Sequence, residues 1–175
     1  STDMYDYFKN HDVIMCAYHE AGHAIYGLLH FFKVEKIHLF FDKKTKTISG
    51  LTSYYYPCVF KNIKDKLLYN ELIQSDVCIN YAGLIVERQL YKNLCGSDAF
   101  PGFWKTGSSS DTKSASDLFK KYKLGEPGKA RLILKKKFIA DTQIELKKFW
   151  KDVILLSHLL FKKKKIFFLD IKNLF

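Results

Sequence analysis

The scarcity of glycine and proline is the feature that most limits what this chain can fold into. Only nine glycines and three prolines occur among its 175 residues, about 7% of the chain against a usual level of roughly 12%. A collagen-like chain and a flexible linker both need far more glycine or proline, so both are excluded. Because 47% of the residues are apolar, the chain has ample material for a core. We expect a single, mainly helical domain.

The helical pattern is clearest over residues 11–32. Asn10 or Asp12 would cap the start of this helix. An apolar face at helical spacing is formed by Val13, Cys16, Ala17, Ala21, Ala24, Ile25 and Leu28.

The pattern changes after this helix. The segments 34–41 and 47–56 are rich in β-branched and aromatic residues, which favours strands. The five residues between them have a length that suits a hairpin loop, and Pro57 would end the second strand. We therefore expect a small antiparallel β-sheet or hairpin beside the helices.

The rest of the chain is predicted to be helical, apart from one loop. Residues 95–110 form the only long stretch rich in Gly, Ser and Pro, and loops of this length are usually functional or disordered. The expected helices are 63–94 in two pieces, a helix from 109–111 to 123, two helices or one bent helix over 127–164, and a short helix over 169–174.

A net charge of +11 raises the possibility of a nucleic-acid partner. Only Arg88 and Arg131 are arginines, whereas the other basic residues are lysines. Recognition of bases and phosphates usually relies on the planar guanidinium group. The lysine surplus therefore indicates a solvated surface, and we expect no nucleic-acid partner.

The cysteines and the hydropathy indicate the compartment. Four cysteines without a CxxC pair are too few for a disulfide scaffold, which favours reduced thiols in a cytoplasmic protein. They are Cys16, Cys58, Cys78 and Cys95. The longest strongly apolar stretch, 153–161, is far shorter than the roughly 20 residues that cross a bilayer. We expect no transmembrane segment in this chain, so any membrane association would depend on parts outside it or on partners.

The sequence His19-Glu20-Ala21-Gly22-His23 carries the clearest chemistry. Two histidines four positions apart project from one face of a helix, where their nitrogens can hold one Zn²⁺ at about 2.0–2.1 Å. Glu20 lies next to them and could accept a proton from a zinc-activated water. A chain of this composition would contain roughly 0.007 such HExxH motifs by chance. The motif therefore predicts a zinc-dependent peptidase.

A catalytic zinc needs a third protein ligand and an open position. His30 could serve in a metzincin-like peptidase, although Gly27 and His30 each come one residue later than that motif requires. One residue is about 100° around a helix. A thermolysin-like site would instead use a glutamate of a following helix, either Glu71 or Glu87. The residues alone leave these alternatives open.

Several motifs in order resemble the peptidase domain of the FtsH family of ATP-dependent zinc metalloproteases. The segment 18–27, YHEAGHAIYG, carries the zinc motif of that family. Three further segments are similar to the strand after its hairpin, to its acidic helix, and to the loop and helix start that bring its third ligand: 49–57 (SGLTSYYYP), 82–87 (AGLIVE) and 106–118 (TGSSSDTKSASDL).

The resemblance implies Asp111 as the third zinc ligand and Glu87 as a group that orients a ligand histidine. It also implies an unfolded polypeptide as substrate and a homo-oligomeric ring as assembly. An extended substrate would pair with the predicted second strand by β-addition. The residues expected to receive it are Ser49, Gly50, Leu51 and Thr52.

Together these observations predict a zinc endopeptidase that hydrolyses unfolded or extended polypeptides through a metal-activated water. His19, His23 and Asp111 would hold Zn²⁺, and Glu20 would be the general base. Residues 1–175 would form one domain, with a catalytic part over 1–125 and a C-terminal helical part over 126–175. The AAA ATPase module of the family would be supplied upstream or by another chain. The alternative is a catalytically silent interaction module with the same fold.

Overall fold

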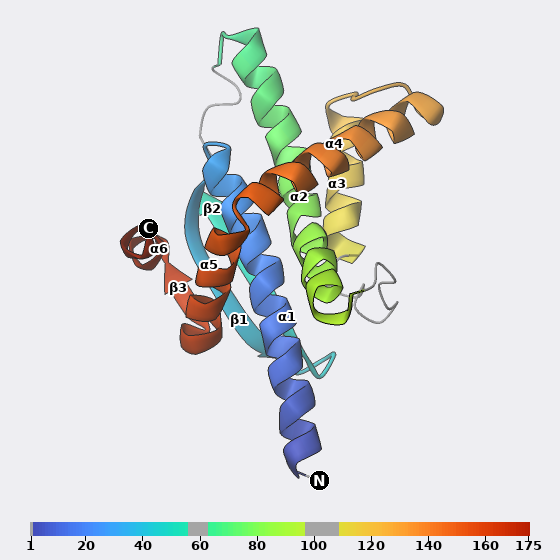
Figure 1. Cartoon of the computed structure of the whole chain (residues 1–175). Coiled ribbons are helices and arrows are strands. Elements are labelled where there is room, and N and C mark those ends of the chain that lie inside the picture. Colours follow the sequence, from blue (N-terminus) through green and yellow to red (C-terminus); the bar gives the residue numbers. More distant parts are fainter. Residues whose placement is uncertain (1, 56–62, 97–108) are drawn as a thin grey trace.

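The computed structural model describes residues 2–55, 63–96 and 109–175, and this part of the chain is mainly helical (Figure 1). A small three-stranded antiparallel sheet accompanies the helices, so the predicted fold class is confirmed. The elements are α1 (Thr2–Leu29), β1 (Lys33–Asp42), β2 (Thr47–Tyr55), α2 (Lys66–Cys95), α3 (Ser109–Lys121), α4 (Lys129–Lys148), α5 (Trp150–Lys163), β3 (Lys165–Phe167) and α6 (Phe168–Leu174).

Helix α1 lies at the centre of the molecule and contacts both strands of the hairpin as well as α2, α4 and α5 (Figure 1). Small side chains let these neighbours come close, since Ala17, Ala21 and Ala24 are completely buried. Gly22 has a similar role, because a Cβ there would lie 2.7 Å from Cγ2 of Val86 in α2. The part of α1 that carries the HExxH motif is therefore enclosed by the neighbouring elements.

The sheet has the strand order β2-β1-β3. Ile37 of β1 pairs with Thr52 on one side and with Ile166 of β3 on the other. Ile37 and Ile166 are fully buried. Strand β2 pairs only with β1 within the described ranges, which leaves its outer edge open. This edge strand is the one predicted from the sequence to pair with an extended substrate.

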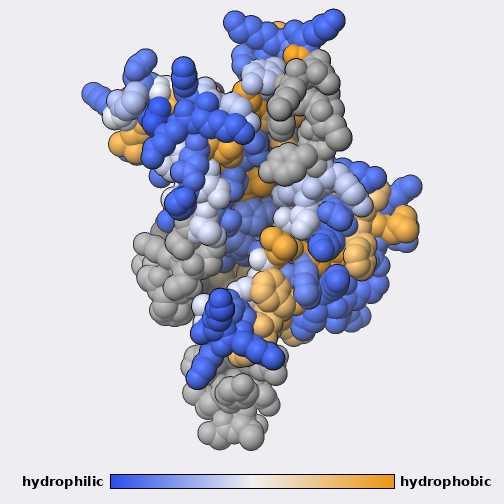
Figure 2. All heavy atoms as spheres, turned by 180° about the vertical axis from the view of Figure 1, so that it is seen from behind, coloured by the Kyte–Doolittle hydropathy of each residue, from blue (hydrophilic) through white to orange (hydrophobic). Residues whose placement is uncertain are grey.

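The face of the sheet opposite to Ile37 and Ile166 carries Phe40, Leu51 and Phe167, which are exposed to solvent. Seen from behind, the molecule shows apolar side chains scattered between polar ones (Figure 2). Antiparallel sheets commonly pack one face on the core and leave the other to water.

Helix α2 is one continuous element, so the prediction of two pieces was wrong. Asp65 caps its start by accepting hydrogen bonds from the backbone N–H groups of Leu67 and Leu68. Gly96 ends it with a left-handed φ of 67°. A buried apolar face that includes Val77 and Val86 runs along the helix and favours a single element.

Helix α1 also differs from its prediction. It extends back to Thr2 and ends at Leu29, so Asn10 and Asp12 lie inside it and do not cap its start. No glycine or proline interrupts residues 2–11, which explains why the helix continues there. At its end, the backbone N–H of Phe32 donates to the carbonyl of Gly27 at 2.9 Å.

The other predicted elements are confirmed, with small shifts of their ends. The hairpin, α3, the two separate helices α4 and α5, and α6 lie where the sequence placed them. Strand β3 was missed, because three residues are too few to show an alternating pattern. Pro57 and most of the 95–110 loop lie outside the described residues.

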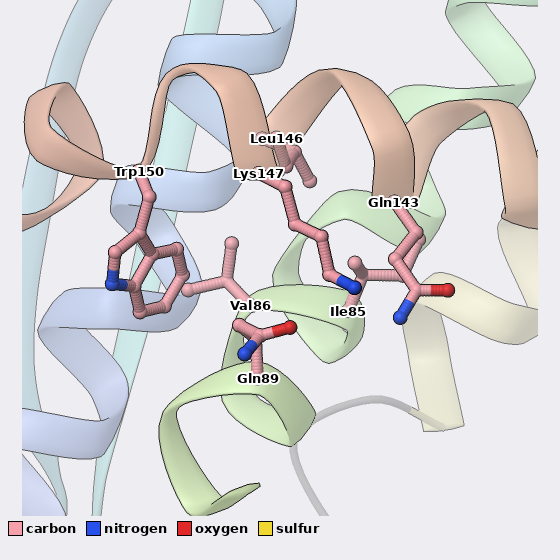
Figure 3. A pocket seen from close by; sticks show the side chains of 7 residues that line it. All are labelled: Ile85, Val86, Gln89, Gln143, Leu146, Lys147 and Trp150. Carbon is pink, nitrogen blue, oxygen red and sulfur yellow. The ribbon is translucent and has the colours of Figure 1, made fainter. Parts of the chain in front are cut away.

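The C-terminal helices support α2 and α1 from one side. At the α4–α5 junction, Trp150 and Leu146 face Ile85 and Val86 of α2, and polar side chains surround this shallow pocket (Figure 3). Val153, Leu156 and Leu160 of α5 are fully buried in the same core. In the described parts of the chain, no helix combines the length and the apolarity that crossing a membrane demands.

Candidate metal centre

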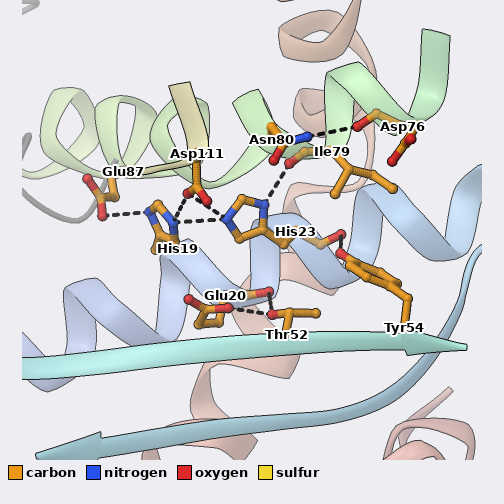
Figure 4. A network of polar contacts seen from close by, with 10 residues as sticks. All are labelled: His19, Glu20, His23, Thr52, Tyr54, Asp76, Ile79, Asn80, Glu87 and Asp111. Atoms are coloured by element: carbon orange, nitrogen blue, oxygen red, sulfur yellow. Dashed lines mark hydrogen bonds and ion pairs between the residues drawn. The ribbon is translucent and has the colours of Figure 1, made fainter. Parts of the chain in front are cut away.

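Three possible metal ligands converge between α1 and the first turn of α3 (Figure 4). The Nε2 atoms of His19 and His23 are 2.9 Å apart. Oδ2 of Asp111 lies 2.9 Å from Nε2 of His19 and 3.0 Å from Nε2 of His23. The two histidines are buried and Asp111 is partly buried. In the part of the chain that the structure describes, this is the group with metal-ligand geometry.

The hydrogen bonds of the two Nδ1 atoms determine whether the converging Nε2 atoms carry a proton or a lone pair. Nδ1 of His23 lies 2.6 Å from the backbone carbonyl oxygen of Ile79, which can only accept, so Nδ1 carries the proton. Nδ1 of His19 donates in the same way to Oε1 of Glu87 at 2.8 Å. In the neutral rings, both Nε2 atoms therefore direct lone pairs toward each other and toward the Asp111 carboxylate.

This donor set fits a zinc ion. Three lone-pair donors within 3.0 Å repel one another unless a cation or a proton lies among them. Their separations are close to the edge of about 3.3 Å expected for a tetrahedron with zinc-ligand distances of about 2.0–2.1 Å. Two imidazoles and one carboxylate leave a fourth position open, as catalytic zinc sites do.

The same contacts shift the pKa values of the ligands. Burial lowers the pKa of His19, but its hydrogen bonds to Asp111 and Glu87 outweigh burial and raise it to about 10. Burial raises the pKa of Asp111, whereas its contacts with the His19 and His23 rings lower the pKa well below its usual range. A proton therefore competes with a metal ion for His19.

The raised pKa predicts how the stability of chelator-treated protein depends on pH. A histidine whose pKa rises from 6.5 to about 10 on folding stabilises the folded state fully below pH 6.5. This contribution is lost as the pH rises toward 10. Urea unfolding of EDTA-treated protein should show a decrease in free energy between these values, and His19→Ala should reduce its slope. A pH-independent free energy over this range would contradict the assigned contacts.

Glu20 lies on the β2 side of α1, away from α2 (Figure 4). Its side chain is only 5% exposed, and the hydroxyl of Thr52 donates a hydrogen bond to its Oε2. Gly50 also faces it, since a Cβ there would lie 2.5 Å from Cγ of Glu20. The candidate general base is therefore held against the edge strand.

Helix α2 approaches the histidines closely at Gly83. A Cβ at this position would lie 2.5–2.7 Å from three ring atoms of His19. Glu87, one turn later, is 7% exposed and holds the far side of the same ring. The helix thus supplies both the space for the imidazole and the acceptor that orients it.

The structure brings together His19, His23 and Asp111, with Glu87 bonded to His19 and Glu20 on the adjacent side of α1. His30 is not part of this group, because its Nε2 lies 2.7 Å from Oε2 of Glu145 and its ring stacks on Tyr26. The metzincin-like alternative therefore lacks its third ligand here.

Glu71 and the four predicted substrate-strand residues also differ in whether they lie near the site. Glu71 is an exposed residue near the start of α2 and does not belong to the ligand group. Of the four predicted substrate-strand residues, Gly50 and Thr52 face Glu20. Ser49 and Leu51 alternate with them along β2, and Leu51 is 54% exposed.

Sequence reasoning missed two features of the site. The carbonyl of Ile79 orients His23, and a backbone acceptor leaves no signal in a sequence. Gly83 did leave a signal in the sequence. A glycine inside a helix costs about 1 kcal/mol relative to alanine, so its presence often marks a point where another group packs closely against the helix.

Neither the comparison with protein-family models nor that with curated proteins gave a match to this chain. The resemblance to the FtsH peptidases therefore rests on the motifs and their order.

Proposed function

We propose that this chain is a zinc-dependent endopeptidase that acts on unfolded or extended polypeptides. The observation that carries the proposal is the convergence of lone-pair donors from His19, His23 and Asp111, together with a buried glutamate beside them. An isolated pair of histidines on a helix does not require a carboxylate from a distant helix. A catalytic zinc site needs a third protein ligand, and Asp111 supplies one.

His19, His23 and Asp111 would hold the ion. When bound, zinc supplies a Lewis acid that polarises the scissile carbonyl and lowers the pKa of a water toward roughly 7. Glu20 would accept the proton of the attacking water and later deliver it to the leaving amine. Glu87 would keep the His19 ring oriented, since its carboxylate accepts the Nδ1 proton.

The open edge of β2 supports an extended polypeptide as substrate. This strand contacts Glu20 through Gly50 and Thr52, so a chain paired with it would run past the base. Main-chain hydrogen bonds would supply most of the affinity and would tolerate many sequences. From the resemblance we further propose a homo-oligomeric ring and an ATPase module that delivers the substrate.

Zinc analysis and hydrolysis of a permanently unfolded protein test this function directly. We expect about one zinc per chain, and we expect cleavage that chelation abolishes and added zinc restores. His19→Ala, His23→Ala and Asp111→Ala should each lose the zinc. His30→Ala is the matched control and should keep it, because His30 pairs with Glu145 instead.

Two results would contradict the proposal. Zinc retained by Asp111→Ala would remove Asp111 from the ligand set. Zinc-loaded wild-type protein that cleaves no unfolded polypeptide would favour the silent interaction module.

A further inference from the structure

The buried carboxylate of Glu20 has a specific partner in the neighbouring strand. A buried carboxylate is unfavourable unless hydrogen bonds compensate for the lost water. The hydroxyl of Thr52 donates such a hydrogen bond to its Oε2. The carbonyl oxygen of Glu20 also lies 3.4 Å from this hydroxyl.

Gly50, at the next inward-facing position of β2, lies against the same carboxylate. A Cβ there would lie 2.7 Å from Oε1 and 2.8 Å from Cδ of Glu20. Any larger residue would therefore have to displace the carboxylate. Gly50 leaves the space, and Thr52 anchors one of the two oxygens within it.

We propose that Thr52 is a positioning residue that holds Glu20 for proton transfer, an inference that rests on the proposed function. With Oε2 accepting from the hydroxyl and Oε1 lying beside Gly50, the carboxylate is held in one position, from which it would accept the proton. The Thr52 side chain faces α1, whereas substrate pairing would use the backbone of β2 at its open edge. The strand that aligns the substrate thus also orients the base.

Steady-state kinetics of zinc-loaded variants test the catalytic part of the inference. Thr52→Val keeps the shape of the side chain and removes its hydroxyl. We expect kcat to fall at least about tenfold, because misplacing a reacting group by about 1 Å can cost about 100-fold. KM and zinc content should stay unchanged, and Thr52→Ser should recover most of the loss. Ser53→Val is the control, because Ser53 alternates with Thr52 along the strand and pairs with Lys36.

A double-mutant cycle measures the contact without any catalysis. Thr52→Val should lower the urea midpoint of the wild-type protein and lower it clearly less in a Glu20→Ala background. Equal decreases in both backgrounds would overturn the inference, and so would an unchanged kcat of Thr52→Val with zinc in place. If the wild-type protein is inactive but the cycle shows coupling, the proposed function fails while the contact between Thr52 and Glu20 stands.

Discussion

Glu20→Gln should greatly slow the hydrolysis of unfolded polypeptides while the protein keeps its zinc. Glutamine matches the shape of glutamate and can still accept the hydrogen bond from Thr52, but its amide cannot take up the proton of the attacking water. General-base catalysis contributes about 10²- to 10⁴-fold, so kcat/KM should fall at least about 100-fold. Glu20 does not belong to the group of His19, His23 and Asp111, which explains why the zinc content should not change.

Glu71→Gln is the matched control for this variant. Glu71 lies exposed near the start of α2, so its substitution should leave both activity and zinc content unchanged. Activity measured with added zinc, next to metal analysis of the same samples, separates a chemical defect from loss of the ion. If Glu20→Gln kept wild-type activity, another group would have to serve as base.

Local patterns were sufficient for the elements that support the site. The helical spacing around His19 and His23 predicted α1, and a helix alone places residues four positions apart on one face. The two strands showed β-branched and aromatic residues, and their loop length fixed the hairpin. The ends of α1 were wrong because helix boundaries depend on where packing and capping stop the chain, and Asn10 and Asp12 had only the composition of a cap.

The third ligand could not be found by local reasoning. Asp111 lies 88 positions after His23, and its approach depends on how α3 packs against α2. From the residues alone, His30, Glu71 and Glu87 remained as candidates, and the resemblance singled out Asp111. The contacts of Thr52 and Gly50 with Glu20 likewise arise only when β2 packs on α1. Such long-range contacts are a property of the tertiary structure.

Gly83 leads to the second large effect, because this position limits the space for a zinc ligand. An alanine Cβ there would lie 2.5 Å from Nε2 and 2.6 Å from Cε1 of His19. The His19 ring has little room to move away, because its Nδ1 is hydrogen-bonded to Glu87 at 2.8 Å and the residue is buried. Gly83→Ala should therefore displace the imidazole from the group of ligands.

We expect Gly83→Ala to weaken zinc binding at least about tenfold, since changes in the groups that orient zinc ligands typically cost about 10- to 100-fold. The direction in which Gly83→Ala changes the free energy of unfolding also tests for the clash. In an open helix, replacing glycine by alanine gains about 1 kcal/mol, so a lower free energy of unfolding would indicate the clash with His19. Competition with a chromogenic chelator gives the zinc affinity, and urea unfolding gives the stability.

Leu94→Ala is the control for an alanine introduced into α2. Leu94 is 65% exposed and lies three turns beyond Gly83, so neither zinc affinity nor activity should change. Wild-type zinc affinity in Gly83→Ala would show that the helices can separate without cost at this point. The close approach at Gly83 would then be a consequence of packing and would not define the ligand geometry. A selective loss of zinc in a folded protein would instead show that α2 sets the position of His19, just as β2 sets the position of Glu20.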